Sequence, residues 1–189
     1  MKAGNRVNGT LISFVASQNV SQKARLAVHN GVLVPTLMYG SESWVWQKKH
    51  ESKINAVEMR SLRSMCGVTL NDRLRNDLIR ERCGLNEDVV TKINKGLLRW
   101  FGHVERMDEN RLTARIYRAT VSGKVSRGRP RRTFIDQVSD VLSKGLVKST
   151  RNRRACMRRC MTVDEAKEVC QDRSKWRSIV SAYPPGRQA

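Results

Sequence analysis

Histidine is scarce in this chain, and the common catalytic signatures are missing. Only three histidines occur among 189 residues. Neither a Walker-type glycine-rich phosphate loop nor an H-E-x-x-H zinc motif is present. Two-metal phosphoryl transfer needs at least two carboxylates near one site, yet the sequence has no aromatic-x-Asp-Asp run. Asp136 and Asp140 stand one helical turn apart but flank a basic region, so we expect structural roles as local charge partners. The sequence therefore predicts no catalytic residue, no cofactor and no enzymatic activity for this chain alone.

Long apolar runs are also lacking. No segment is apolar enough for a membrane span, and the first residues have no signal-peptide character. No strongly amphipathic basic helix carries Trp and Phe on one face, which argues against a membrane surface as partner. Five cysteines, an odd number, are scattered along the chain, and we expect reduced thiols. These features predict an intracellular protein without secretion, and the basic clusters of the chain extend this prediction to a nuclear or cytoplasmic location.

Basic residues dominate the charge. The chain holds 37 Lys and Arg against 17 Asp and Glu, for a net charge of +20. Residues 110–189 alone carry 20 of the basic and 6 of the acidic residues. Since 39% of the residues are apolar, a folded core is expected beside this charge. The balance predicts a polyanionic partner, of which nucleic acid, RNA or DNA, is the commonest.

Apolar spacing and end signals predict an all-α fold, a multi-helix bundle followed by a basic loop and a smaller helical unit. The predicted parts are a helical domain at 1–109, a basic linker at 110–132, a helical unit at 133–183 and a disordered tail at 184–189. Pro35 predicts a kink or a new helix start. Other predicted helix ends are a cap at Ser21, a start at Asn71, a start at Asn86, a capping box at Thr162, and stops at Gly67 and Gly84.

The helix predicted from Asn86 to Met107 has two different sides. Apolar residues recur at spacings of three and four: Val90, Ile93, Leu97, Trp100, Val104 and Met107. Gly102 interrupts the helix and indicates close packing or a bend there. The other side is cationic and either faces solvent or lies along a phosphate backbone. Its members are Lys92, Lys95, Arg99, His103 and Arg106.

Two acid-free stretches supply further candidates for phosphate contact. The first includes "VSRGRPRRTF", which has the Gly-Arg-Pro core of an AT-hook but also suits a cationic hinge between helices. Its candidate contacts are Lys124, Arg127, Arg129, Arg131 and Arg132. The second stretch, between Asp140 and Asp164, adds Arg151, Arg154 and Arg158.

Three late cysteines raise the question of a zinc site. Cys156, Cys160 and Cys170 do not have standard finger or knuckle spacing, and no histidine lies nearby. Cysteine on a helix face commonly serves as a small core residue. We therefore predict core thiols and no metal site.

Several segments, in order, resemble LINE-type (non-LTR, jockey-like) retrotransposon reverse transcriptases. They are "GVLVPTLMYGSESWVW" (31–46), "EMRSLRSMCGVTLNDRLRND" (58–77), "LLRWFGHVERMDENRL" (97–112), "GRPRRTFIDQV" (128–138) and "DRSKWRSIV" (172–180). The resemblance covers nearly the whole chain, and Gly-His-Val-x-Arg-Met is its most specific piece. It places the chain at the thumb and post-thumb region, with residues 1–109 as the thumb-like domain.

The resemblance implies a helical unit that grips template-primer or target nucleic acid. The catalytic palm of this family of RNA-directed DNA polymerases would lie upstream of Met1. The family's cysteine-histidine knuckle does not match the cysteines here, so no zinc is implied. The alternatives are a scaffold that self-associates or packs with a palm domain, and a transposon-derived product without selected function.

Overall fold

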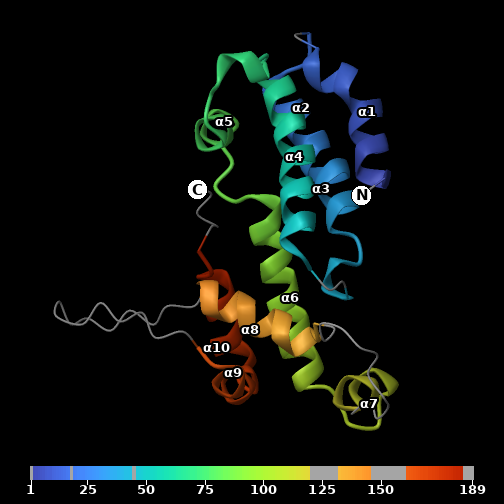
Figure 1. Cartoon of the computed structure of the whole chain (residues 1–189), viewed down its shortest axis with the longest axis vertical. Coiled ribbons are helices and arrows are strands. Elements are labelled where there is room, and N and C mark those ends of the chain that lie inside the picture. Colours follow the sequence, from blue (N-terminus) through green and yellow to red (C-terminus); the bar gives the residue numbers. More distant parts are fainter. Residues whose placement is uncertain (1, 18, 44–45, 120–131, 146–160, 185–189) are drawn as a thin grey trace, which may run out of the picture. The chain divides into compact units, whose positions relative to one another are not determined.

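The structure is a computed structural model that describes residues 2–17, 19–43, 46–119, 132–145 and 161–184 (Figure 1). Every regular element in these ranges is helical, and none of these residues forms a strand, as the all-α prediction required. The chain divides into two compact units. Unit 1 lies within Met1–Ile93 and unit 2 within Asn94–Pro184, so the division falls inside a helix rather than at residue 109.

Unit 1 consists of α1 (Lys2–Ala16), α2 (Gln22–Val28), α3 (Val34–Met38), α4 (Lys48–Met65), α5 (Asn76–Arg82) and the first residues of α6 (Val89–Glu105). Short 3-10 turns occur at Ser41–Ser43 and Leu70–Asp72. Two buried apolar clusters hold it together. One gathers Leu33, Leu37, Ile54, Val57 and Ile93, and the other gathers Val15, Leu62, Met65, Ile79 and Cys83. Burial of these faces is the main source of stability for helices this short.

The helix around Pro35 shows how the chain accommodates a proline. A π-helical turn, His29–Leu33, joins α2 to α3, and the amide of Val34 donates to the carbonyl of His29. Pro35 follows in the first turn of α3, where a missing N–H costs little. The predicted kink or new start is therefore a single π turn followed by a new helical segment.

A buried ion pair links α4, α5 and α6 of unit 1. The Arg80 guanidinium donates to Glu58 Oε2 at 2.9 Å, and both side chains are almost fully buried. The other Glu58 oxygen accepts the amide of Val89 at 3.2 Å, so the same carboxylate caps the start of α6. Burial raises the pKa of Glu58, and the contacts with Arg80 oppose that rise.

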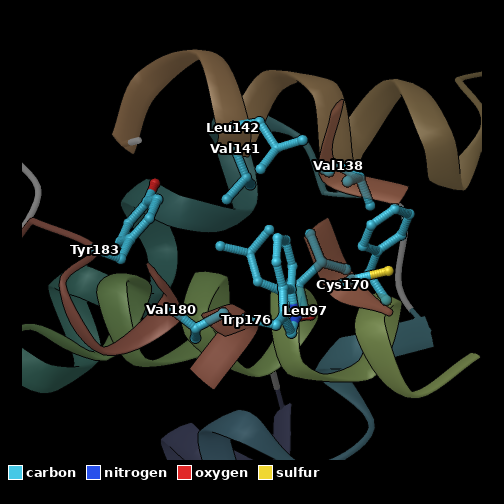
Figure 2. Close-up of a cluster of buried hydrophobic side chains, with 11 residues drawn as sticks. Leu97, Val138, Val141, Leu142, Cys170, Trp176, Val180 and Tyr183 are labelled. Atoms are coloured by element: carbon cyan, nitrogen blue, oxygen red, sulfur yellow. Dashed lines mark hydrogen bonds between the residues drawn. The ribbon is translucent and has the colours of Figure 1, made fainter. Parts of the chain in front are cut away.

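Unit 2 consists of most of α6 together with α7 (Leu112–Arg118), α8 (Phe134–Gly145), α9 (Val163–Cys170) and α10 (Arg173–Ser181). Its core gathers side chains from α6, α8, α9 and α10, including Leu97, Val138, Leu142, Cys170 and Trp176 (Figure 2). Phe101 and Leu98 are fully buried there as well, although the predicted apolar stripe of α6 omitted both.

At Gly102, α6 packs closely against α10. A Cβ atom at this position would lie 2.3 Å from the indole nitrogen of Trp176, well inside contact distance. Trp176 is buried, and its Nε1 donates to the carbonyl of Leu98 at 2.9 Å. The close packing predicted from a mid-helix glycine is therefore confirmed, and its partner is α10.

Local capping signals placed most helix ends correctly. Ser21 accepts the amide of Ala24, and Thr162 forms a capping box with Glu165. Gly67 and Gly84 follow α4 and α5 in the left-handed conformation, with φ of 65° and 67°.

Four predicted boundaries need correction. The helix expected from Asn71 begins at Asn76, after a 3-10 turn with its own capping box. The helix expected from Asn86 begins at Val89, because the carboxylate of Asp88 accepts the amide of Thr91. The helix predicted to start at the Thr162 capping box ends at Cys170, and a separate helix, α10, follows because Asp172 caps it. The predicted linker contains α7.

Candidate nucleic-acid interface

A basic cleft lies in unit 2 between α6 and α10. Its volume is about 810 Å³. Among the described residues that line it, Asp108 is the single carboxylate. The basic residues in the lining are Arg99, His103, Arg106, Arg111, Arg173 and Arg177. Such a concentration of guanidinium groups around one hollow favours an anion with several negative charges.

Helical periodicity places these side chains. Arg99 and His103 are four residues apart on α6 and share a face, and Arg106 follows in the turn directly after the helix. Arg173 and Arg177 are four residues apart on α10 and also share a face. Each set therefore presents its charge along one side of its helix.

Trp176 packs between α6 and α10 and sets the separation of these two helices at the cleft. Its ring packs against Phe101 with 5.9 Å between centroids and contacts the backbone at Gly102. The α10 helix begins at Asp172, whose carboxylate accepts the amides of Ser174 and Lys175. These local hydrogen bonds to backbone amides lower the pKa of Asp172.

The arginines of the cleft differ in how much of their side chain is available. Arg99, Arg111, Arg173 and Arg177 are exposed. Arg106 is half-buried, and its guanidinium donates to the carbonyl of Cys170, which ties the turn after α6 to the end of α9. Arg106 therefore has a structural role in addition to lining the cleft, whereas the exposed arginines are accessible to a ligand.

An aromatic side chain lies beside the cationic face of α6. The rings of Trp100 and His103 are 5.5 Å apart and tilted by 40°. Trp100 is half-buried and does not belong to the described core of unit 2, although the spacing of α6 favoured a core position. A partly accessible indole next to arginine is the arrangement that stacks on nucleic-acid bases.

Comparison with known proteins relates the chain to a transposon-derived protein. That protein, from Caenorhabditis elegans, is 30% identical to the chain over 95 residues. The match covers 49% of this chain and 34% of that protein, so the chain spans about a third of its relative. This similarity fits a transposon origin. No protein-family model and no solved structure matches the chain.

The predicted cationic row on α6 is not continuous. Lys95 is only 7% exposed, and its ammonium donates to the carbonyl of Ser181 at 3.1 Å. The Lys95 ammonium is therefore used within unit 2, which makes Lys95 a weaker candidate for phosphate contact than its place in the row suggested. Lys92 is half-buried and belongs to unit 1, where its charge acts on His29. Only Arg99, His103 and Arg106 remain together at the cleft.

Arg132 is also engaged within the protein. It forms an ion pair with Asp140 and is half-buried. The carboxylate of Asp136 accepts the amide of Thr133 and caps α8. The structural roles predicted for Asp136 and Asp140 are thus confirmed, and Arg132 is a weaker candidate for phosphate contact than its place in the basic loop suggested.

The remaining candidates of the basic stretches lie outside the described residues. They are Lys124, Arg127, Arg129, Arg131, Arg151, Arg154 and Arg158, together with Cys156 and Cys160. Cys170 is buried in the core of unit 2, and its thiol donates to the carbonyl of Lys167. Within the described ranges, no group of three or more His, Cys, Asp or Glu residues could hold a metal ion.

The sequence-based set of contacts omitted three arginines of the cleft. Arg173 and Arg177 stand at helical spacing in "DRSKWRSIV", and Arg111 is the N-cap residue of α7. The spacing of Arg173 and Arg177 shows that they share a face. It does not show that this face lies opposite Arg99, which depends on the contact between Trp176 and Gly102.

Among the described helices, none is long and apolar enough to cross a membrane.

Proposed function

We propose that the chain binds nucleic acid by phosphate contacts in the cleft of unit 2, as a thumb and post-thumb part of a non-LTR retrotransposon reverse transcriptase. The observation that carries the proposal is the convergence of exposed Arg99, Arg173 and Arg177 on one hollow with a single carboxylate. The net charge of +20 and the resemblance of segments 97–112 and 172–180 to this family support it, since those segments supply α6 and α10.

Arginine suits this role because its planar fork donates two parallel hydrogen bonds to a phosphate. A backbone of regularly spaced phosphates could engage α6 and α10 together, whereas a single small anion would engage fewer of these side chains. The nearby pair of Trp100 and His103 offers ring surface for an unpaired base. The arrangement contacts charge and ring faces and therefore favours binding with little sequence preference.

A matched pair of triple variants tests the proposal. One variant removes cleft charge by R99Q, R173Q and R177Q, and the other removes the same charge from exposed positions of unit 1 by R60Q, R75Q and R82Q. Fluorescence anisotropy with labelled RNA and DNA oligonucleotides measures the affinity. We expect the cleft variant to bind at least about tenfold more weakly than the control. Each phosphate contact that is removed also removes the release of counterions that favours binding. Equal affinities in the two variants would overturn the proposal.

We further propose that the chain does not polymerise nucleotides by itself, because the sequence has no aromatic-x-Asp-Asp run to hold two metal ions. A primer-extension assay with template, nucleotides and Mg²⁺ measures this directly. We expect binding of the template-primer without extension. Extension that survives repurification of the chain would contradict this part of the proposal.

A second candidate role rests on α7. Leu112 and Ile116 are one helical turn apart and 69% and 66% exposed. An apolar pair of this kind favours self-association or packing against a palm domain. Size-exclusion chromatography in high salt, where charge contacts are weak, tests self-association. Oligomers that dissociate in the L112Q/I116Q variant would support this role, and a monomer in both proteins would exclude self-association.

A further inference from the structure

Two cysteines meet where α4 and α5 end. Cys66 is the C-cap of α4, Cys83 is the C-cap of α5, and their Sγ atoms are 3.4 Å apart. Each is followed by a left-handed glycine, Gly67 or Gly84, that turns the chain away from its helix. Both sulfur atoms are therefore held by helix-end geometry rather than by freely rotating loops.

The surroundings of the two thiols differ. Cys83 is 2% exposed and lies in the core cluster of unit 1, whereas Cys66 packs at the edge of that cluster and is half-buried. Burial, together with the neighbouring Cys66, raises the pKa of Cys83 to about 12. Cys66 is consequently the sulfur that a reagent in solution reaches first, and Cys83 is placed behind it.

A cation lies close to this pair. The Arg25 guanidinium donates to the carbonyls of Met65 and Val15, at 2.8 and 3.3 Å, and its charge acts on the thiol of Cys83. This charge opposes the rise in the pKa of Cys83 that burial causes. The side chain that joins α1, α2 and α4 thus also acts on the sulfur of Cys83.

We propose that Cys66 and Cys83 form a redox-sensitive dithiol that closes to an intramolecular disulfide on reaction with a peroxide. The Cys66 thiolate attacks one peroxide oxygen and the O–O bond breaks, which forms a sulfenic acid on Cys66 and releases hydroxide. This hydroxide takes up the proton that the Cys66 thiol had lost and gives the first water. The Cys83 sulfur then attacks Sγ of Cys66 and expels hydroxide, which takes up the Cys83 proton to give a second water. Two electrons pass from the thiols to the peroxide, which is fully reduced.

The geometry favours disulfide closure over metal binding. The sulfur atoms must approach from 3.4 Å to about 2.05 Å, a change that side-chain rotation at two helix ends can supply. No third ligand from the described residues completes a metal site here. The bond would join the ends of α4 and α5, whose cysteines are 17 positions apart in the sequence. It would fix α5 to α4 within unit 1.

Peptide mapping of the full chain tests the proposal. The reduced protein is treated with hydrogen peroxide, its remaining thiols are alkylated, and the digest is analysed by mass spectrometry. We expect a cross-linked peptide pair that joins Cys66 to Cys83 and is cleaved by a thiol reductant. The C66S and C83S variants should lose this pair, and the C170A variant, which changes another buried thiol, should keep it.

A stability measurement on the wild-type chain tests the disulfide without relying on variants that could misfold. The oxidised wild-type chain should unfold at a higher temperature than the reduced one, and reductant should reverse the shift. Peroxide treatment that leaves Cys66 over-oxidised without a cross-link, or that joins other cysteines in the native chain, would overturn the proposal. Because the pair lies in unit 1 and the basic cleft in unit 2, this result is independent of nucleic-acid binding.

Discussion

At Gly102, a hydrogen atom in place of a methyl group allows α6 and α10 to meet in unit 2. The indole of Trp176 occupies the space that a Cβ would need, and Trp176 is 2% exposed. The sequence showed that a mid-helix glycine needs a packing reason. It could not identify the partner, because Trp176 lies far along the chain and is brought near only by the core.

The G102A variant should lose stability. Overpacking costs about 1–3 kcal/mol and exceeds the gain of about 1 kcal/mol in helix propensity. Urea denaturation measures the free energy of unfolding. The control is G9A in α1, where nothing lies within 4 Å of the added methyl and the propensity gain acts alone. A G102A protein as stable as G9A would show that the contact with Trp176 is not close.

His29 makes the stability of unit 1 depend on pH. Burial, aided by the charge of Lys92, lowers its pKa to about 4, while its Nδ1 lies 3.0 Å from the hydroxyl of Ser61. His29 therefore binds a proton near pH 6.5 in the unfolded state, whereas in the folded state it binds one only near pH 4. His29 should reduce stability as the pH falls from about 6.5 to 4, by about 1.4 kcal/mol per pH unit.

The comparison of wild type with H29N isolates this effect. The asparagine side chain of the variant has no proton to take up, so the free energy of unfolding should change less steeply over the same pH range. Chemical denaturation at several pH values gives both curves. Parallel curves would contradict the assignment, even if H29N is less stable throughout.

At the scale of elements, sequence signals that act over a few residues were sufficient to place helix caps. Contacts between residues far apart in the sequence could not be predicted in this way. Caps such as Ser21 and Thr162 act within one turn, so the sequence placed them correctly. The start of α6 was placed too early, because Asp88 rather than Asn86 accepts an amide of the first turn. The burial of Lys95 depends on Ser181, which is 86 residues away, and no local pattern reports it.

The buried pair of Glu58 and Arg80 couples α4, α5 and α6 of unit 1. We expect R80M to destabilise the chain by about 3–5 kcal/mol, because it leaves a buried carboxylate without its partner. The double variant E58Q/R80M should recover part of this loss. The exposed pair of Arg75 and Asp77 serves as the control, and R75M should cost less than about 1 kcal/mol. Equal losses at the two sites would contradict the coupling role.

At the scale of the whole molecule, apolar spacing and helix-end signals predicted an all-helical protein, and the net charge predicted a polyanionic partner. The all-helical class is confirmed within the described residues, whereas binding remains a proposal. The candidate site could be predicted only in part. Arg99 and His103 were predicted from one face of α6, but Arg173 and Arg177 complete the cleft through tertiary packing that the sequence pattern does not encode.

The most direct test of the account is the salt dependence of binding. The logarithm of the association constant is plotted against the logarithm of salt concentration for the wild type, the R99Q/R173Q/R177Q variant and the R60Q/R75Q/R82Q control. If the cleft grips phosphates, the slope of the cleft variant on a single strand should be shallower than wild type by about two units, while the control keeps the wild-type slope. Three parallel lines would contradict the claim that the arginines of α6 and α10 contact nucleic acid.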